Sequence, residues 1–121
     1  MAWGAKDAAT QLTAITTAEK FFDDLVSLNP GETAHVEVEA NPPATPTDHL
    51  KVSVYGTLDT TTESWDETAI MSFTIDKDLA DPNKASFLVS GVFKFRVGVV
   101  VDGATDTYVA DMNHRVNGIS L

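Results

Sequence analysis

The stretch "VFKFRVGVVVDGATDTYVADMNHRV", residues Val92 to Val116, contains two strand-like runs joined by a short polar segment. Apolar residues share one face of each run: Phe93, Phe95, Val97, Val99 and Val101, then Tyr108, Ala110, Met112 and Val116. This period of two is typical of a strand that buries one face. Asp102 and Gly103, between the runs, are favoured in hairpin turns. The sequence therefore predicts a long hairpin in the middle of a two-sheet core.

Earlier segments repeat the same pattern. Apolar residues alternate with polar ones over residues 34–40, 50–58 and 71–75, and Leu58 is expected to share the apolar face of its segment. Three prolines between residues 41 and 48, and polar runs over 59–67 and 76–84, predict loops. About eight strands with turn residues at regular intervals favour an all-β, antiparallel β-sandwich or a barrel.

Residues 17–28 are compatible with either a helix or a strand. Thr16 and Glu19 match a capping box, and apolar residues follow at helical spacing. Asn29–Glu32, "NPGE", instead matches a type II turn, which commonly joins strands. We therefore favour residues 24–28 as a strand that forms a hairpin with residues 34–40.

Composition excludes several classes of function. The 121-residue chain is long enough for one domain, and its net charge of −10 disfavours binding to nucleic acid or to a membrane surface. It contains no cysteine, which excludes disulfides and thiolate sites. We expect no signal peptide, because the first residues lack a basic start and a continuous apolar run.

The titratable residues form no recognisable catalytic motif. His35, His49 and His114 lack the spacing of a histidine pair that binds a metal. Asp76, Asp78, Asp81 and Asn83 offer oxygen ligands, but without the glycine and glutamate of a calcium-binding EF-hand loop. We therefore expect no metal site, no cofactor and no enzymatic activity. Tyr55 and Trp65 leave a sugar-stacking platform as an alternative.

The N-terminal segment differs in composition from the rest of the chain. Residues 1–17 are mostly small and polar, so we predict an extended arm over 1–17 and a β-sandwich domain over 18–121. Tryptophan is enriched among the residues that dominate protein interfaces. The predicted partner-binding residues of the arm are Trp3, Leu12 and Ile15.

Four stretches together resemble the decoration, or cement, proteins of tailed phages: "LNPGETAHVEVE", "VYGTLDTTTESWDETAIMSFTID", "DPNKASFLVSGVFKFRVGV" and "DTYVADMNHRVNGISL". The resemblance implies a jelly roll of about eight strands and binding to the outer surface of the major capsid protein. It also implies a homo-oligomer, a trimer or a dimer, on the capsid exterior of the virion, made in the host cytoplasm. The alternative is a carbohydrate- or receptor-binding β-sandwich module, such as a phage fibre or adhesin domain.

Overall fold

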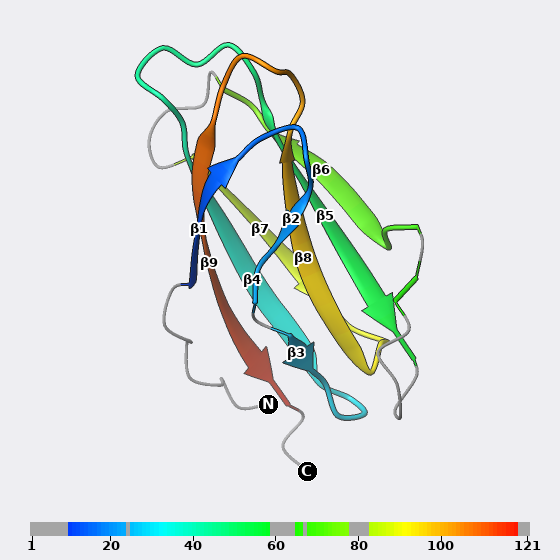
Figure 1. The fold of residues 1–121 in the computed structure, drawn as a ribbon. Coiled ribbons are helices and arrows are strands. Elements are labelled where there is room, and N and C mark those ends of the chain that lie inside the picture. Colours follow the sequence, from blue (N-terminus) through cyan, green and yellow to red (C-terminus); the bar gives the residue numbers. More distant parts are fainter. Residues whose placement is uncertain (1–9, 24, 59–64, 67, 78–82, 119–121) are drawn as a thin grey trace.

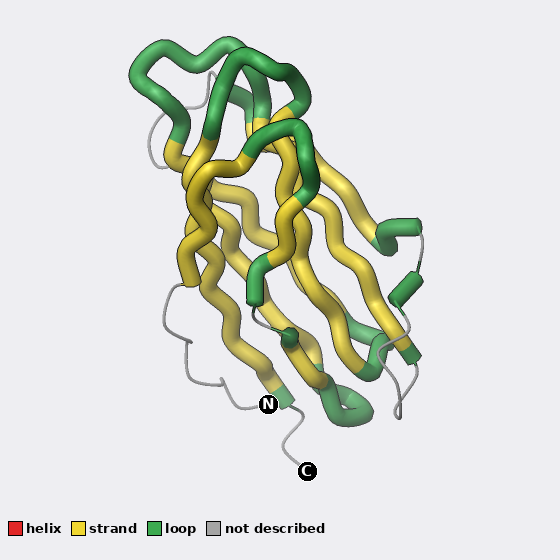
Figure 2. Tube along the Cα trace, viewed as in Figure 1, coloured by secondary structure: helices red, strands yellow, loops and turns green. Residues whose placement is uncertain are grey.

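Two antiparallel sheets pack face to face in the computed structural model, which describes residues 10–23, 25–58, 65–66, 68–77 and 83–118 (Figure 1). These residues contain strands and loops but no helix, and hence no helix that could span a membrane (Figure 2). The strands are β1 (Thr10–Ile15), β2 (Lys20–Phe21), β3 (Val26–Ser27), β4 (Thr33–Asn41), β5 (Leu50–Thr57), β6 (Met71–Ile75), β7 (Asn83–Val89), β8 (Lys94–Val101) and β9 (Tyr108–Asn117).

The strand order is that of a jelly roll. One sheet has the order β1-β9-β4-β7, and the other has the order β2-β8-β5-β6, with β3 also pairing with β8. β2 pairs with Gly98 and Val99, and β3 pairs with Lys94 and Phe95, so the two short strands follow one another along the same edge of β8. Counted as one interrupted strand, they complete an eight-stranded, two-sheet jelly roll. The predicted fold class is confirmed.

The predicted hairpins at the two ends of the chain are wrong. β8 pairs with β5 and belongs to the five-stranded sheet, whereas β9 pairs with β4 and β1 in the other sheet. Residues 102–107 therefore cross from one sheet to the other. β3 likewise pairs with β8 and not with β4, so the turn at Asn29–Glu32 also crosses between the sheets. Alternation identifies a strand that buries one face, but it does not specify the strand's neighbours.

The predicted arm over residues 1–17 needs correction, because its described part belongs to the sandwich. β1 pairs with β9 from Thr10↔Met112 to Ile15↔Tyr108, with a register shift between Leu12 and Ile15. Ile15 is 0% exposed, and Leu12 packs against the core. A strand with a fully buried residue cannot also serve as a free arm. Trp3 lies outside the described residues.

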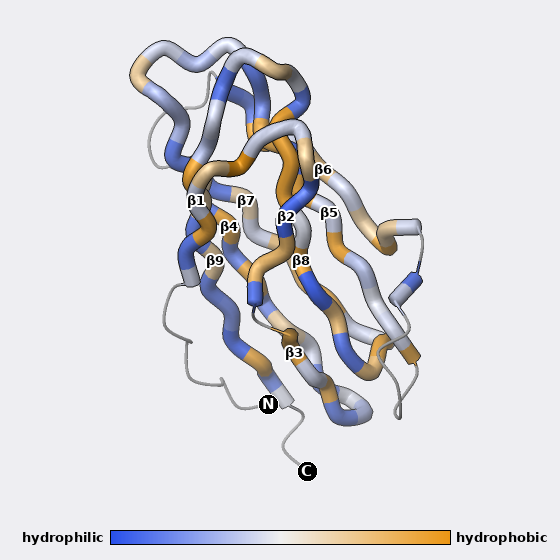
Figure 3. Tube along the Cα trace, in the orientation of Figure 1, coloured by the Kyte–Doolittle hydropathy of each residue, from blue (hydrophilic) through white to orange (hydrophobic). Residues whose placement is uncertain are grey.

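The core lies between the two sheets and is built from the inward positions of the central strands. β4, β5 and β8 contribute most of its valines, and Phe95 on β8 is 0% exposed. Figure 3 shows hydrophobic and hydrophilic residues alternating over the first half of β8, which ends in a run of valines. Leu58 was expected to share the buried face of β5, but it is 76% exposed because β5 ends at Thr57. On the outward face Ser53 is also buried, and its hydroxyl lies 2.9 Å from that of Ser72 on β6.

Carboxylates fasten two loops together at one end of the sandwich. Asp106 Oδ2 accepts hydrogen bonds from the backbone N–H groups of Thr47 and Asp48, at 2.6 and 2.7 Å. In return, Asp48 Oδ2 accepts from the N–H groups of Thr105 and Asp106, at 2.9 and 2.8 Å. A Cβ atom at Gly103 would overlap the Asp48 carboxylate. This glycine therefore allows the two loops to approach closely.

We expect Asp106→Ala to lower the free energy of unfolding by about 2–4 kcal/mol, because two backbone N–H groups at a largely buried site lose their acceptor. Urea denaturation followed by circular dichroism measures the change. Asp23→Ala is the control, because it removes the same charge from an exposed side chain. Equal effects of the two substitutions would show that the carboxylate does not hold the loops.

Tyr108 gives this end of the sandwich a dependence on alkaline pH. Its hydroxyl donates to the carbonyl oxygen of Asp48, and burial, followed by the negative charge of Asp106, raises the pKa of Tyr108 above its usual value of 10.0. The unfolded chain therefore releases this proton at a lower pH than the folded protein does. The resulting stabilisation is complete below about pH 10 and is lost as the pH rises through the folded-state pKa.

We expect Tyr108→Phe to lose less stability than the wild type between pH 9 and pH 11, because phenylalanine cannot ionise. Unfolding free energies measured in urea across this range give, for each protein, the slope of stability against pH. The pKa of Tyr55 is also raised, mainly by burial, so part of the slope persists in the variant. Identical slopes for the two proteins would contradict the assignment to Tyr108.

Candidate interaction site on the outer face of one sheet

The outer face of the five-stranded sheet carries a cluster of aromatic side chains around one arginine. Tyr55 on β5 pairs with Arg96 on β8, and both side chains point away from the core. Phe21 on β2 pairs with Gly98, the next outward position along β8. Trp65 joins them from the segment that follows β5. We call Glu19, Phe21, Tyr55, Trp65 and Arg96 the Arg96 cluster.

Arg96 lies among three rings. Its guanidinium carbon is 3.8 Å from the centroid of the Phe21 ring, 4.9 Å from that of Trp65 and 6.0 Å from that of Tyr55. The Phe21 and Tyr55 rings meet edge to face, with centroids 5.7 Å apart and planes inclined at 64°. Cation–π contacts of this kind contribute about 0.5–2 kcal/mol each, so the rings fix the position of the guanidinium.

The backbone around the cluster explains how the side chains meet. A Cβ atom at Gly98 would lie 2.9 Å from Phe21 Cε1 and 3.0 Å from Glu19 Oε2, so the absence of a side chain leaves room for both groups over β8. The Asp66 N–H donates to the carbonyl oxygen of Gly56 at 3.1 Å, which holds the neighbouring Trp65 beside β5. The site thus depends on residues that are far apart in the sequence.

Arg96 remains without an acidic partner among the described residues. None of them accepts a hydrogen bond from its guanidinium, and Arg96 Nε is buried without a hydrogen-bond partner. Glu19 is engaged elsewhere, because its carboxylate accepts from the Tyr55 hydroxyl at 3.1 and 3.2 Å. Burial and then Glu19 raise the pKa of Tyr55, which keeps its hydroxyl protonated as the donor. The site presents a positioned cation that can receive a carboxylate.

The structure brings some of the candidate residues predicted from the sequence together and places others in the core. Tyr55 and Trp65, proposed as a stacking platform, lie in the same cluster, but Arg96 lies over both rings. The alternation over residues 93–101 leaves Arg96 on the polar face of its strand, but it does not indicate that rings surround this side chain. Phe21 was missed because β2 has only two residues and shows no alternation. Leu12 and Ile15 contribute to the sandwich, as described above.

The histidines and the acidic turn do not converge on a site. His35 lies on β4, His114 on β9, and His49 just before β5. His49 Nδ1 accepts a hydrogen bond from the Lys77 N–H at 2.9 Å. A ring nitrogen that accepts a hydrogen bond carries no proton, so the 3.6 Å distance from Nδ1 to Asp76 Oδ1 is not an ion pair. The described residues contain no group of three side chains suited to a metal ion. Asp78 and Asp81 lie outside the described residues.

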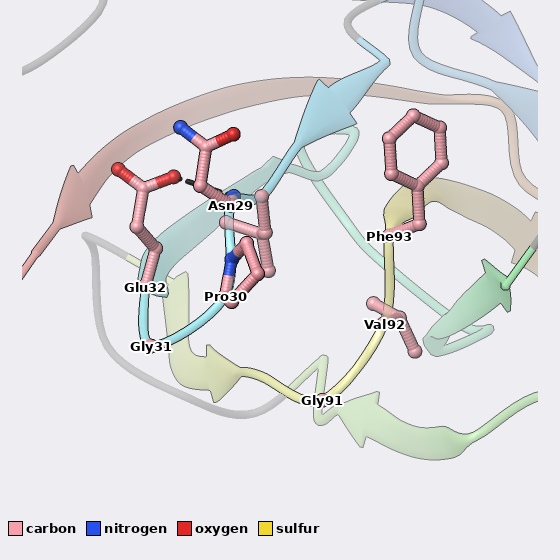
Figure 4. A pocket seen from close by; sticks show the side chains of 8 residues that line it. Asn29, Pro30, Gly31, Glu32, Gly91, Val92 and Phe93 are labelled. Atoms are coloured by element: carbon pink, nitrogen blue, oxygen red, sulfur yellow. Dashed lines mark hydrogen bonds between the residues drawn. The ribbon is translucent and has the colours of Figure 1, made fainter. Parts of the chain in front are cut away.

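A pocket of about 230 Å³ lies at the end of the sandwich that holds the β3–β4 turn (Figure 4). It is lined by Leu28, Asn29, Pro30, Gly31, Glu32, Gly91, Val92 and Phe93. The predicted type II turn is present here: the Glu32 N–H donates to the Asn29 carbonyl oxygen at 3.0 Å, and Gly31 has a φ of 85°. Glu32 Oε1 accepts from the Asn29 N–H at 2.6 Å, so this carboxylate stabilises its own turn. The pocket lacks converging groups for catalysis.

Comparisons with known proteins give a likeness of fold. No protein-family model matches the chain, and no curated protein matches its sequence. A solved structure of a protein from the endospore appendages of Bacillus, which are disulfide-linked pili, superposes with a TM-score of 0.50. The sequence identity is 15%, and the match covers 98% of this chain and 93% of the other. This chain contains no cysteine and so cannot form such links.

Proposed function

We propose that this chain is a structural, non-enzymatic subunit of an extracellular protein assembly. The Arg96 cluster carries the proposal, because arginine, tryptophan and tyrosine are the residues enriched in the energetically dominant parts of protein interfaces. The cluster occupies an outer face, separate from the hydrophobic core that holds the sandwich together. The fold likeness to a pilus protein supports the same kind of role.

The assembly we propose is the capsid of a tailed phage. The chain would decorate and stabilise the shell as a homo-oligomer bound to the outer surface of the major capsid protein, after synthesis in the host cytoplasm. The resemblance in sequence to decoration proteins supports this choice over a pilus. The net charge of −10 supports a protein partner over nucleic acid or a membrane.

Contact with the capsid protein is assigned to Trp3. Residues 1–9 precede β1, and Trp3 is the large aromatic side chain of this segment. Leu12 and Ile15 are withdrawn from the proposed contact because both face the sandwich core. A tryptophan that fills an apolar pocket on a partner commonly contributes about 2 kcal/mol or more to binding.

Co-sedimentation with isolated phage shells tests this function. We expect the full chain to sediment with the shells and Trp3→Ala to bind about thirtyfold more weakly. Leu58→Ala is the matched control, because it truncates another large apolar side chain that is 76% exposed. Failure of the full chain to bind shells would reject the capsid role. Equal binding by Trp3→Ala would reject Trp3 as the contact.

A carbohydrate- or receptor-binding module is the second candidate, favoured by the proximity of Tyr55 and Trp65. Both rings lie within 6.0 Å of the same guanidinium, and both residues are partly exposed, as a surface that stacks against a sugar requires. A glycan array with the wild type and Trp65→Ala separates the two functions. Sugar binding that disappears in Trp65→Ala would favour the module over the structural subunit.

A further inference from the structure

The two outer faces of the sandwich carry opposite charges that lack partners at their centres. Arg96 lies on β8, a central strand of the five-stranded sheet, and Glu37 lies on β4, a central strand of the other sheet. Both are partly exposed, and they point away from the core in opposite directions. Neither side chain forms an ion pair with another described residue, so each offers a charge that a partner can meet.

The five-stranded face is the cationic one. Lys51 on β5 and Lys94 on β8 occupy outward positions of the same alternation as Arg96, but both lie outside the Arg96 cluster and take no part in the proposed contact. Arg96 is held rigidly by its three rings, so little conformational entropy remains to be lost when it binds a partner. These properties suit a carboxylate from another protein surface.

The four-stranded face offers such a carboxylate. The cross-strand neighbours of Glu37 are Ser86 on β7 and Asn113 on β9, both uncharged. Glu39, two residues along β4, differs because its carboxylate lies 3.7 Å from Lys84 Nζ. Glu37 is therefore the acidic side chain of β4 whose directly opposite neighbours are both uncharged, and Lys84 and Arg115 lie one outward position farther along β7 and β9. Its partly exposed position on a central strand makes it accessible to a second copy of the chain.

We propose that copies of this chain stack with the five-stranded face of one against the four-stranded face of the next, and that Arg96 receives Glu37 of the neighbouring copy. The proposal rests on the proposed function of an assembly subunit and names its self-contact. A guanidinium binds a carboxylate through two parallel hydrogen bonds, and the surrounding rings exclude water from them. Because the two surfaces differ, the contact is head to tail and builds a ring or a filament.

Two variants test the contact by complementation. Arg96→Met removes the cation from one face and leaves Glu37 intact, whereas Glu37→Gln does the reverse. Each variant alone should associate about thirtyfold more weakly than the wild type in sedimentation velocity. Mixed in equal amounts, they still offer one intact Arg96 and one intact Glu37 face. The mixture should therefore form dimers that do not grow further.

Lys51→Gln is the matched control, since it removes one positive charge from the same outer face at an exposed position away from the cluster. Thermal melts confirm that each variant is folded. Glu37→Arg is the second variant, because it leaves the Arg96 cluster unchanged and should also prevent stacking if Arg96→Met does not fold. Restored dimers in the mixture, with Lys51→Gln behaving as the wild type, support the contact.

Self-association of both variants at wild-type strength would overturn the proposed contact. A mixture no more associated than its separate components would also overturn it. Neither result bears on binding to shells through Trp3, which the co-sedimentation experiment measures separately. Loss of shell binding by the wild type would instead reject the capsid role.

Discussion

Deleting residues 2–17 is expected to lower the free energy of unfolding by at least about 3–5 kcal/mol more than deleting residues 2–9. The longer deletion removes β1, its pairing with β9 and the buried side chain of Ile15. Loss of the Ile15 side chain alone has the effect of a large truncation in the core. In addition, the backbone groups of β9 that face β1 lose their hydrogen-bond partners. Urea denaturation of the two truncated chains, followed by circular dichroism, measures the difference.

Ile15→Ala in the full-length chain controls for the effect of shortening. We expect it to cost about 2–5 kcal/mol, because the side chain is 0% exposed. Equal stability of the two truncated proteins would show that β1 is dispensable and that the sandwich begins after residue 17.

Phe95→Ala is expected to lower the free energy of unfolding by about 3–5 kcal/mol. Phe95 is 0% exposed on the inner face of β8, the strand that pairs with β5 on one side and with β2 and β3 on the other. Its truncation leaves a cavity between the sheets. Domains of this size are stable by about 5–15 kcal/mol, so the loss is a large part of the total.

Leu88→Ala is the control for Phe95→Ala. Leu88 is a large apolar residue within β7, but it is 63% exposed on the outer face of its sheet. We expect its truncation to change stability by less than about 0.5 kcal/mol. A loss of stability in Phe95→Ala no greater than that in Leu88→Ala would contradict the assignment of the core.

The strands could be predicted from the sequence where the alternation is local and regular. The buried faces of β4 and β8 follow directly from their apolar residues. The pairing of strands could not be predicted in the same way, because it depends on contacts between distant segments. Asp102 and Gly103 indicated a hairpin, but the glycine is required by the nearby Asp48 carboxylate, which lies more than fifty residues earlier in the chain.

β1 was missed because an irregularity conceals its period. The register shifts between Leu12 and Ile15, and Ala14 has a φ of 52°. Leu12 and Ile15 are three residues apart and both face the core, whereas regular alternation would place them on opposite faces. A segment of mostly small and polar residues with this spacing shows neither the strand nor the helix pattern.

The candidate site was predictable only in part. Tyr55 and Trp65 were identified as unusual aromatic residues near a loop, and the structure brings them together. Their relation to Arg96 and Phe21 depends on the pairing of β8 with β5 and β2, which the sequence does not reveal. Trp3 remains a prediction, since it lies outside the described residues.

Sedimentation velocity of the unmodified chain, alone and with isolated phage shells, tests most directly the central claim that this jelly roll is an assembly subunit. We predict species heavier than the 13.0 kDa monomer whose fraction rises with concentration, and a further fraction that moves with the shells. A single 13.0 kDa species at every concentration, with none bound to shells, would contradict the claim.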